Sequence, residues 1–208
     1  MDSRLELFHY NHIDNDAPLT VFTLHGTGGT EDDFLFLDRL LSKRYNLVGL
    51  RGNVSENGMN RFFRRTAPGV FDQESIRTES GKLQQFVRAW MLEHHVEREQ
   101  AFMLGYSNGA NIILATLMYY PGLVGGLVLM HPMLPVRDET ADLSHTKGLL
   151  TYGLTDRMIS PDSSREAITV LRDAGVDLTV KDYPSGHEVS EQELKDVVAW
   201  LDAPGSIA

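Results

Sequence analysis

Residues 101–112 of this chain read Ala-Phe-Met-Leu-Gly-Tyr-Ser-Asn-Gly-Ala-Asn-Ile. A short apolar run there ends in Gly-x-Ser-x-Gly, and apolar residues at helical spacing follow it. This pattern is typical of a nucleophile elbow, a sharp strand-to-helix turn that exposes the hydroxyl of Ser107. We expect glycine at 105 and 109 because such a turn leaves no room for a Cβ atom at either position. A plain glycine-rich turn with a capping serine is the alternative, and the apolar flanks argue against it.

Strands and helices alternate on both sides of this segment. The apolar patterns predict strands over 20–24, 47–50, 102–104, 127–130, 149–152 and 178–183. They predict helices over 34–41, 76–96, 110–118, 161–174 and 191–201, and an irregular stretch from 51 to about 74. The alternation indicates an α/β fold with a mostly parallel central sheet, helices on both faces and no large lid. In such sheets the functional residues gather at the carboxyl ends of the strands.

Composition narrows the class of protein. The 208 residues contain no linker, repeat or low-complexity tract, so we expect one domain over 1–208. A formal charge of -10 argues against nucleic acid and anionic membranes as partners. The absence of cysteine excludes disulfides and a thiol nucleophile. Because no segment looks like a signal peptide or a membrane span, we predict no membrane insertion and a cytoplasmic location.

A serine nucleophile needs a base and a group that orients the base. In hydrolases with this elbow the chain order is serine, acid, histidine, and the histidine that follows the late acid loop is His187. Asp156 follows an apolar strand and is the preferred acid. Asp162 and Asp182 are the competitors, but the first suits the opening turn of a helix and the second a solvated strand end. The predicted triad is therefore Ser107, His187 and Asp156.

The tetrahedral intermediate of acyl transfer also needs hydrogen-bond donors for its oxyanion. The backbone N–H of Asn108, next to the nucleophile, is one candidate, and the N–H of Thr27 in the His25–Gly29 loop is the second. A phosphate-binding loop is the rival interpretation of that glycine-rich segment. It fails because neither Gly-Lys-Ser/Thr nor the Gly-x-Gly-x-x-Gly spacing is present. We expect no cofactor and no metal.

The chain resembles the phospholipase/carboxylesterase family of α/β-hydrolases, which includes bacterial carboxylesterases and acyl-protein thioesterases. The resemblance covers nearly the whole chain and lies in four segments, 24–29, 105–109, 153–156 and 185–187. It implies an α/β-hydrolase fold and cofactor-free hydrolysis of carboxylic esters through an acyl-enzyme. The chain departs from the thioesterase branch at Asn108, where glutamine is usual, and at Thr27, where leucine is usual. The segments 51–53 and 61–65 look more like the bacterial esterases.

The function predicted from these observations is a serine carboxylesterase for small to medium esters, because no insertion is long enough to form a lid or a lipid tunnel. The alternatives are a lysophospholipase or acyl-protein thioesterase, a non-catalytic receptor on the same fold, and perhydrolysis by the same triad. The expected partner is a small-molecule ester, and a homodimer is left open.

Four arginines stand out in the irregular stretch, namely Arg51, Arg61, Arg64 and Arg65. The favoured interpretation is pairing with the excess of carboxylates, and the alternative is a site for an anionic substrate. Candidate substrate contacts are Phe62, Phe63 and Arg64, with the phenylalanines either lining an acyl pocket or packing beneath it. His131, which follows a predicted strand, is a further candidate for the pocket lining.

Overall fold

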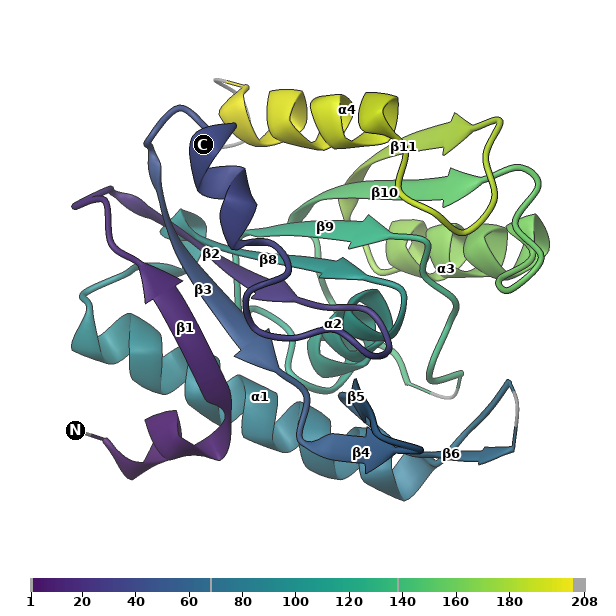
Figure 1. Ribbon diagram of the computed structural model, residues 1–208, viewed down its shortest axis with the longest axis horizontal. Coiled ribbons are helices and arrows are strands. Elements are labelled where there is room, and N and C mark those ends of the chain that lie inside the picture. The colour runs from purple at the N-terminus through teal and green to yellow at the C-terminus, as the bar shows by residue number, and fades with distance from the viewer. Residues whose placement is uncertain (1, 68, 138, 204–208) are drawn as a thin grey trace.

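A seven-stranded sheet forms the centre of the computed structural model, which describes residues 2–67, 69–137 and 139–203 (Figure 1). Its strands lie in the order β1-β3-β2-β8-β9-β10-β11. Their bounds are β1 His9–Ile13, β2 Leu19–Leu24, β3 Tyr45–Arg51, β8 Ala101–Tyr106, β9 Gly126–Met130, β10 Lys147–Gly153 and β11 Asp177–Tyr183. All neighbouring strands pair in parallel except β1, which pairs antiparallel with β3 at the edge. The prediction of a mostly parallel sheet is confirmed.

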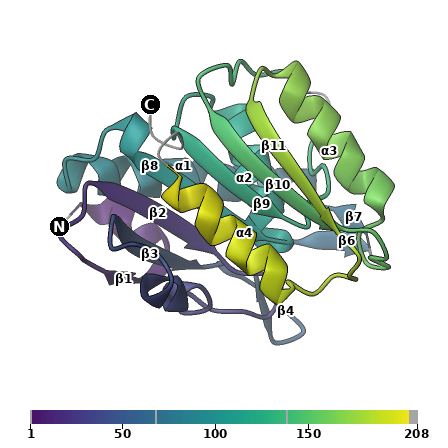
Figure 2. The same cartoon turned by 90° about the horizontal axis from the view of Figure 1, so that it is seen from above.

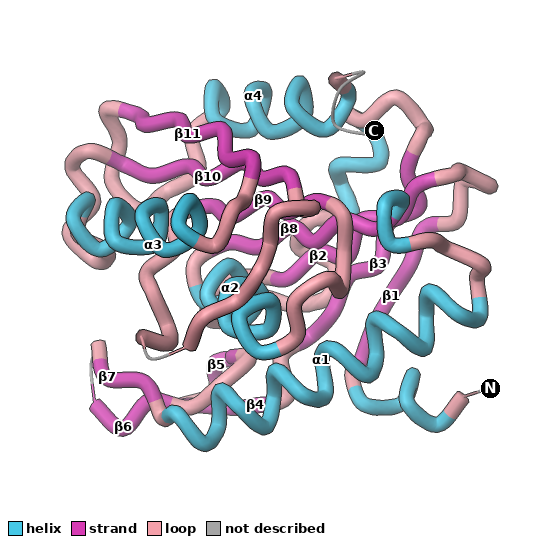
Figure 3. The backbone as a smooth tube through the Cα atoms, turned by 180° about the vertical axis from the view of Figure 1, so that it is seen from behind, coloured by secondary structure: helices cyan, strands magenta, loops and turns pink. Residues whose placement is uncertain are grey.

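Helices cover both faces of the sheet, as predicted. The helices α1 (Gln73–Glu93), α2 (Asn108–Tyr119) and α3 (Pro161–Asp173) pack on one face (Figure 3). The helix α4 (Glu191–Asp202) and the 3-10 helix η2 (Leu35–Arg39) pack on the other, and Figure 2 shows α4 across the strands from α2. Side chains alternate along each strand, so Phe22 of β2 packs in the first core and its neighbour Val21 in the second. Two short 3-10 helices, η1 (Ser3–Leu7) and η3 (Arg98–Gln100), complete the described helices.

Two predicted elements differ from the structure. Residues 34–41 do not form an α-helix but only η2, because Phe36 and Leu40 face solvent and a left-handed backbone at Lys43 ends the segment. The stretch from 51 to 74 is more ordered than predicted. It contains two small antiparallel pairs, β4 (Val54–Glu56) with β5 (Met59–Arg61) and β6 (Arg65–Ala67) with β7 (Val70–Phe71).

The carboxyl ends of the parallel strands meet along one edge of the sheet. The register aligns Leu24 with Gly105, Tyr106 with Met130, and Gly153 with Tyr183. The loops after these strands therefore lie side by side, and they carry every residue predicted to take part in catalysis. Within the described residues no helix is both long enough and apolar enough to span a bilayer.

Candidate active site

Ser107 lies at the turn between β8 and α2 in a backbone conformation that few residues adopt. Its φ is 51° and its ψ is -110°, and its N–H donates to the carbonyl of Met130 at 2.8 Å. A Cβ atom on Gly105 would lie 2.6 Å from the nitrogen of Ala110, and one on Gly109 would lie 2.2 Å from the oxygen of Leu24. Both positions therefore require glycine, as the elbow predicts.

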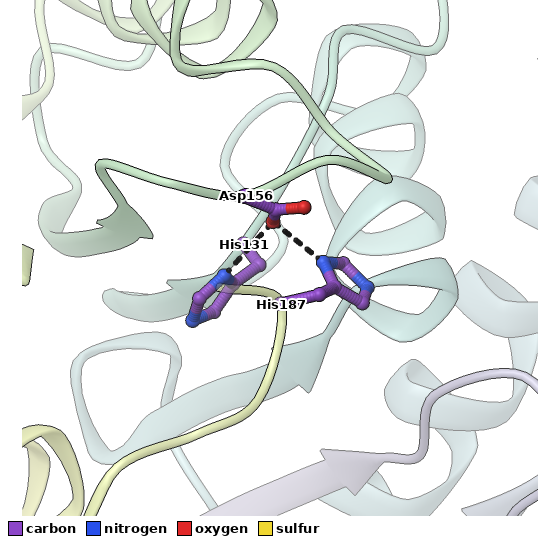
Figure 4. Close-up of side chains that lie close together, drawn as sticks. All are labelled: His131, Asp156 and His187. Carbon is purple, nitrogen blue, oxygen red and sulfur yellow. Dashed lines mark hydrogen bonds and ion pairs between the residues drawn. The ribbon is translucent and has the colours of Figure 1, made fainter. Parts of the chain in front are cut away.

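Three side chains form a continuous line of hydrogen bonds at this edge. Ser107 Oγ lies 2.9 Å from Nε2 of His187. Nδ1 of the same imidazole lies 2.7 Å from Oδ2 of Asp156 (Figure 4). The structure thus brings the three predicted triad residues together, in the geometry that proton transfer from the serine to the imidazole requires.

The carboxylate of Asp156 is buried, and both of its oxygens have hydrogen-bond partners. Its Oδ1 accepts hydrogen bonds from the backbone N–H groups of Met158 at 2.8 Å and Ile159 at 2.9 Å. Burial alone would raise the pKa of Asp156, but these two N–H groups and His187 lower it below its usual value. Asp156 is therefore held as an anion, and its Oδ2 faces Nδ1 of His187.

The loop that carries His187 is tied to the sheet and to the loop of Asp156. The hydroxyl of Tyr106 donates to the carbonyl of His187 at 2.7 Å. Thr155 donates to the carbonyl of Ser185 through both its N–H, at 3.0 Å, and its hydroxyl, at 2.8 Å. Tyr106 was not singled out from the sequence. Its position between the glycine and the serine of the elbow is the signal that places it beneath the histidine loop.

A second histidine lies behind the acid. His131 is fully buried, with Nδ1 3.3 Å from Oδ2 of Asp156 and Nε2 3.1 Å from Oε2 of Glu193. Burial alone would lower the pKa of His131, but Glu193 and Asp156 raise it above its usual value. Because both ring nitrogens face carboxylate oxygens, the charged imidazolium satisfies both contacts. The other oxygen of Glu193 accepts a hydrogen bond from the Thr151 hydroxyl at 2.6 Å.

His131, Asp156 and His187 together have the composition of a metal site. One ligand atom of each lies within 4.8 Å of the others (Figure 4). Oδ2 of Asp156 lies 3.3 Å from Nδ1 of His131 and 2.7 Å from Nδ1 of His187, so these atoms have partners without an ion. The expectation that the protein needs no metal stays a prediction.

A cavity of about 100 Å³ opens beside Ser107 and His187, and both residues predicted for the oxyanion site, Thr27 and Asn108, line it. Asn108 is the first residue of α2, so its N–H belongs to the group that has no acceptor within the helix. Two larger hollows, of about 390 and 420 Å³, lie elsewhere on the described surface. A third, of about 440 Å³, adjoins the cavity and shares Gly69, Phe71 and Met133 with it, but Ser107 and His187 line none of the three. The smaller cavity is therefore the candidate site, because Ser107 and His187 line it.

The structure corrects the prediction of direct substrate contacts by four residues. Phe62 and Phe63 are fully buried in the core and pack beneath the cavity, which was the alternative open to them. Arg64 projects into solvent and pairs with Asp72 at 3.2 Å. His131 is buried behind Asp156. None of the four is among the described residues that line the cavity.

The four arginines divide into two groups. Arg51 pairs with Glu31 and Arg64 with Asp72, which agrees with the favoured interpretation of the cluster. Arg61 and Arg65 also pair with a carboxylate, that of Glu56, and in addition they line the cavity. The sequence marked the cluster but could not show which of its members face the nucleophile.

The sheet order, the elbow and the aligned side chains define an α/β-hydrolase. The chain belongs to the phospholipase/carboxylesterase family, whose model matches residues 12–204. It is accordingly a carboxylic ester hydrolase. The resemblance and the fold class predicted from the sequence are both confirmed.

Individual relatives agree with this assignment. The chain is 36% identical over 178 residues to MhqD of Bacillus subtilis, a protein named as a hydrolase, and the match covers 85% of this chain and 89% of MhqD. The crystal structure of a Bacillus cereus carboxylesterase shares 34% identity with a TM-score of 0.87, over 94% of this chain and 93% of that one. A Mesorhizobium loti carboxylesterase structure shares 28% identity with a TM-score of 0.88, over 95% and 96%.

Proposed function

We propose that this protein is a serine carboxylesterase that hydrolyses small to medium esters through an acyl-enzyme. The observation that carries the proposal is the line of hydrogen bonds from Ser107 through His187 to Asp156, at 2.9 and 2.7 Å, on a strained turn beside a cavity.

In the first half of the reaction, His187 accepts the proton of Ser107 as the serine oxygen attacks the ester carbonyl. Asp156 keeps the imidazole in the tautomer that presents a free Nε2 to the serine. The N–H groups of Asn108 and Thr27 donate to the oxyanion of the tetrahedral intermediate. The protonated His187 then gives its proton to the leaving alkoxide, and the acyl group remains on the serine.

In the second half, a water molecule gives a proton to His187 and attacks the acyl carbonyl. The second tetrahedral intermediate collapses, the carboxylic acid leaves, and the proton returns to Ser107. The elements needed for both halves are side chains and backbone groups of this chain.

The size of the cavity favours short acyl groups. At about 100 Å³ the cavity that holds Ser107 is smaller than the 300–1,000 Å³ typical of pockets that enclose drug-sized ligands. A hollow of about 440 Å³ adjoins it, so a long acyl chain would have to extend out of the cavity into that hollow. A lysophospholipase or an acyl-protein thioesterase must accommodate a long chain instead.

The test is hydrolysis of p-nitrophenyl esters from acetate to palmitate by the wild type and the Ser107→Ala variant. We expect the highest kcat/KM on the short esters and loss of turnover in the variant. The matched control is Ser144→Ala, which replaces an exposed serine shortly before β10 and should leave the rate unchanged. Preference for palmitate would favour the thioesterase or lysophospholipase alternative. Absence of wild-type turnover would favour a receptor.

A further inference from the structure

The cavity beside Ser107 is positively charged, although the chain as a whole is acidic. Two arginines, Arg61 and Arg65, are among the described residues that line it, and no aspartate or glutamate is. The charge of the cavity lining is therefore opposite in sign to the net charge of the chain, which is -10.

The two arginines share one carboxylate. Arg65 bonds Glu56 with Nη2 at 2.9 Å and with Nε at 3.2 Å. Arg61 Nε lies 3.2 Å from Oε2 of the same glutamate. Two guanidinium groups thus face a single counter-charge, which leaves one positive charge in excess next to the nucleophile.

Arg61 is only 4% exposed, and such burial is uncommon for an arginine. Burial lowers the pKa of Arg61, and the neighbouring Arg65 lowers it further, but a guanidinium remains charged in proteins. Its Nη1 donates to the hydroxyl of Thr27 at 2.6 Å, and its Nε to the carbonyl of Phe63 at 3.3 Å. Within the described part of the chain, no hydrogen bond uses its remaining nitrogen, Nη2.

Asn108 offers a second unused donor in the same lining. Its Oδ1 accepts the N–H of Phe62 at 2.7 Å, which fixes the orientation of the amide. Its Nδ2 is buried and has no hydrogen-bond partner among the described residues. A buried donor without an acceptor is costly, and an acceptor atom of a ligand in the cavity would satisfy it. Among the described residues, the lining of the cavity therefore combines an excess positive charge and two unused donors with the absence of any carboxylate.

We propose that this cavity is a carboxylate-binding subsite, and that the substrates of Ser107 are short esters carrying a carboxylate on their acyl or alcohol part. A carboxylate offers only acceptors and suits the forked donors of arginine. The small volume of the cavity limits the distance between this carboxylate and the scissile ester to a few bonds. The inference rests on the proposed esterase function and specifies its substrate class.

Pairs of esters that differ only in charge test the proposal. Monoethyl succinate carries the carboxylate on the acyl part, and ethyl isocaproate is its neutral counterpart of similar shape. O-acetylglycolate carries it on the alcohol part, and isobutyl acetate is the counterpart. With kcat/KM measured by pH-stat titration, we expect at least one anionic ester to exceed its counterpart by about tenfold or more.

Variants then test whether the preference for anionic esters depends on the arginines of the cavity. The ratio of anionic to neutral kcat/KM should fall about tenfold in Arg61→Gln and in Arg65→Gln. It should rise in Glu56→Gln, which removes the shared counter-charge. Arg64→Gln is the matched control, because Arg64 is the chain neighbour of Arg65 but pairs with Asp72 outside the cavity, and its ratio should equal that of the wild type.

The outcomes separate this proposal from the esterase function. Turnover of both neutral esters at rates equal to or above those of their anionic partners would overturn the carboxylate subsite and leave the esterase intact. An anion preference that survives in both Arg65→Gln and Arg61→Gln would also overturn it. If no ester of either pair is hydrolysed, the esterase function fails and this proposal with it. Should Arg61→Gln fail to fold, the opposite shifts expected in Arg65→Gln and Glu56→Gln still decide the matter.

Discussion

Replacement of Glu193 by alanine would test the buried contacts behind Asp156. Glu193 is fully buried, lies 3.1 Å from His131 and accepts the Thr151 hydroxyl at 2.6 Å. Alanine leaves the charged imidazole with a single carboxylate neighbour and the hydroxyl without its acceptor. Removing one partner of a buried ion pair costs about 3–5 kcal/mol. Because 1 kcal/mol shifts the Tm of a chain of this size by about 2–4 °C, we expect the Tm to fall by about 6–20 °C.

This loss of stability should depend on pH. The folded protein raises the pKa of His131 above its usual value, so the folded state binds the proton more tightly than the unfolded chain. The resulting stabilisation is fully present below the unfolded pKa of about 6.5 and is lost as pH rises through the folded pKa. The difference in Tm between wild type and Glu193→Ala should therefore be largest near about pH 6 and shrink toward about pH 9.

Differential scanning calorimetry across this pH range is the assay, and Glu191→Ala is the control. Glu191 lies in the first turn of the same helix, but it is exposed and pairs with Lys195 at the surface. Its replacement should change the Tm little and without a pH trend. If Glu193→Ala lowers the Tm no more than Glu191→Ala does, or by the same amount at both ends of the range, the charged pair with His131 is refuted.

Three further substitutions, one of them with a control variant, test other parts of the site. Tyr106→Phe removes the hydrogen bond to the carbonyl of His187, and steady-state kinetics should show kcat reduced about threefold to tenfold with KM little changed; an unchanged kcat would contradict the positioning role. Gly109→Ala forces a Cβ atom against a backbone oxygen of β2 and should lower the free energy of unfolding by about 3 kcal/mol in urea titrations. Gly122→Ala, in open space at a φ of +75°, should cost only about 1 kcal/mol, and equal losses would refute the close-approach argument. Asp156→Asn should lower kcat on the order of 10⁴-fold, as in other triads where the amide favours the wrong imidazole tautomer, and a loss below tenfold would count against Asp156 as the acid.

The elements of the fold that were predicted correctly carry their signal locally. Runs such as 20–24 and 127–130 are buried on both faces and read as continuous apolar strands. The edge strand β1, with the sequence His-Tyr-Asn-His-Ile, was missed because it is polar and partly exposed and is a strand only through its pairing with β3. The segment 34–41 has helical spacing but is too short and too exposed to hold an α-helix.

In the candidate site, too, the residues with a local sequence signal could be predicted and the residues placed by long-range contacts could not. Ser107, Asp156 and His187 could be predicted because the elbow and the chain order are local features of the sequence. Glu193 could not, because Ser190 and Glu193 form a capping box at the start of α4, and this local role explains the glutamate without its contact to His131. The direction of Arg61 into the cavity depends on contacts between residues far apart in the sequence, such as the hydrogen bonds of Arg61 to Thr27 and of Phe62 to Asn108, which no periodicity in the sequence reveals.

Trapping of the acyl-enzyme tests the central claim most directly. Wild type and Ser107→Ala would be mixed with excess p-nitrophenyl butyrate, quenched in acid within the first turnover, and analysed by intact-protein and peptide mass spectrometry. The proposed mechanism predicts a mass increase of one butyryl group on the wild-type peptide that contains Ser107, and none on the variant. Ester turnover without acylation of Ser107, or with the acyl group on another residue, would contradict it.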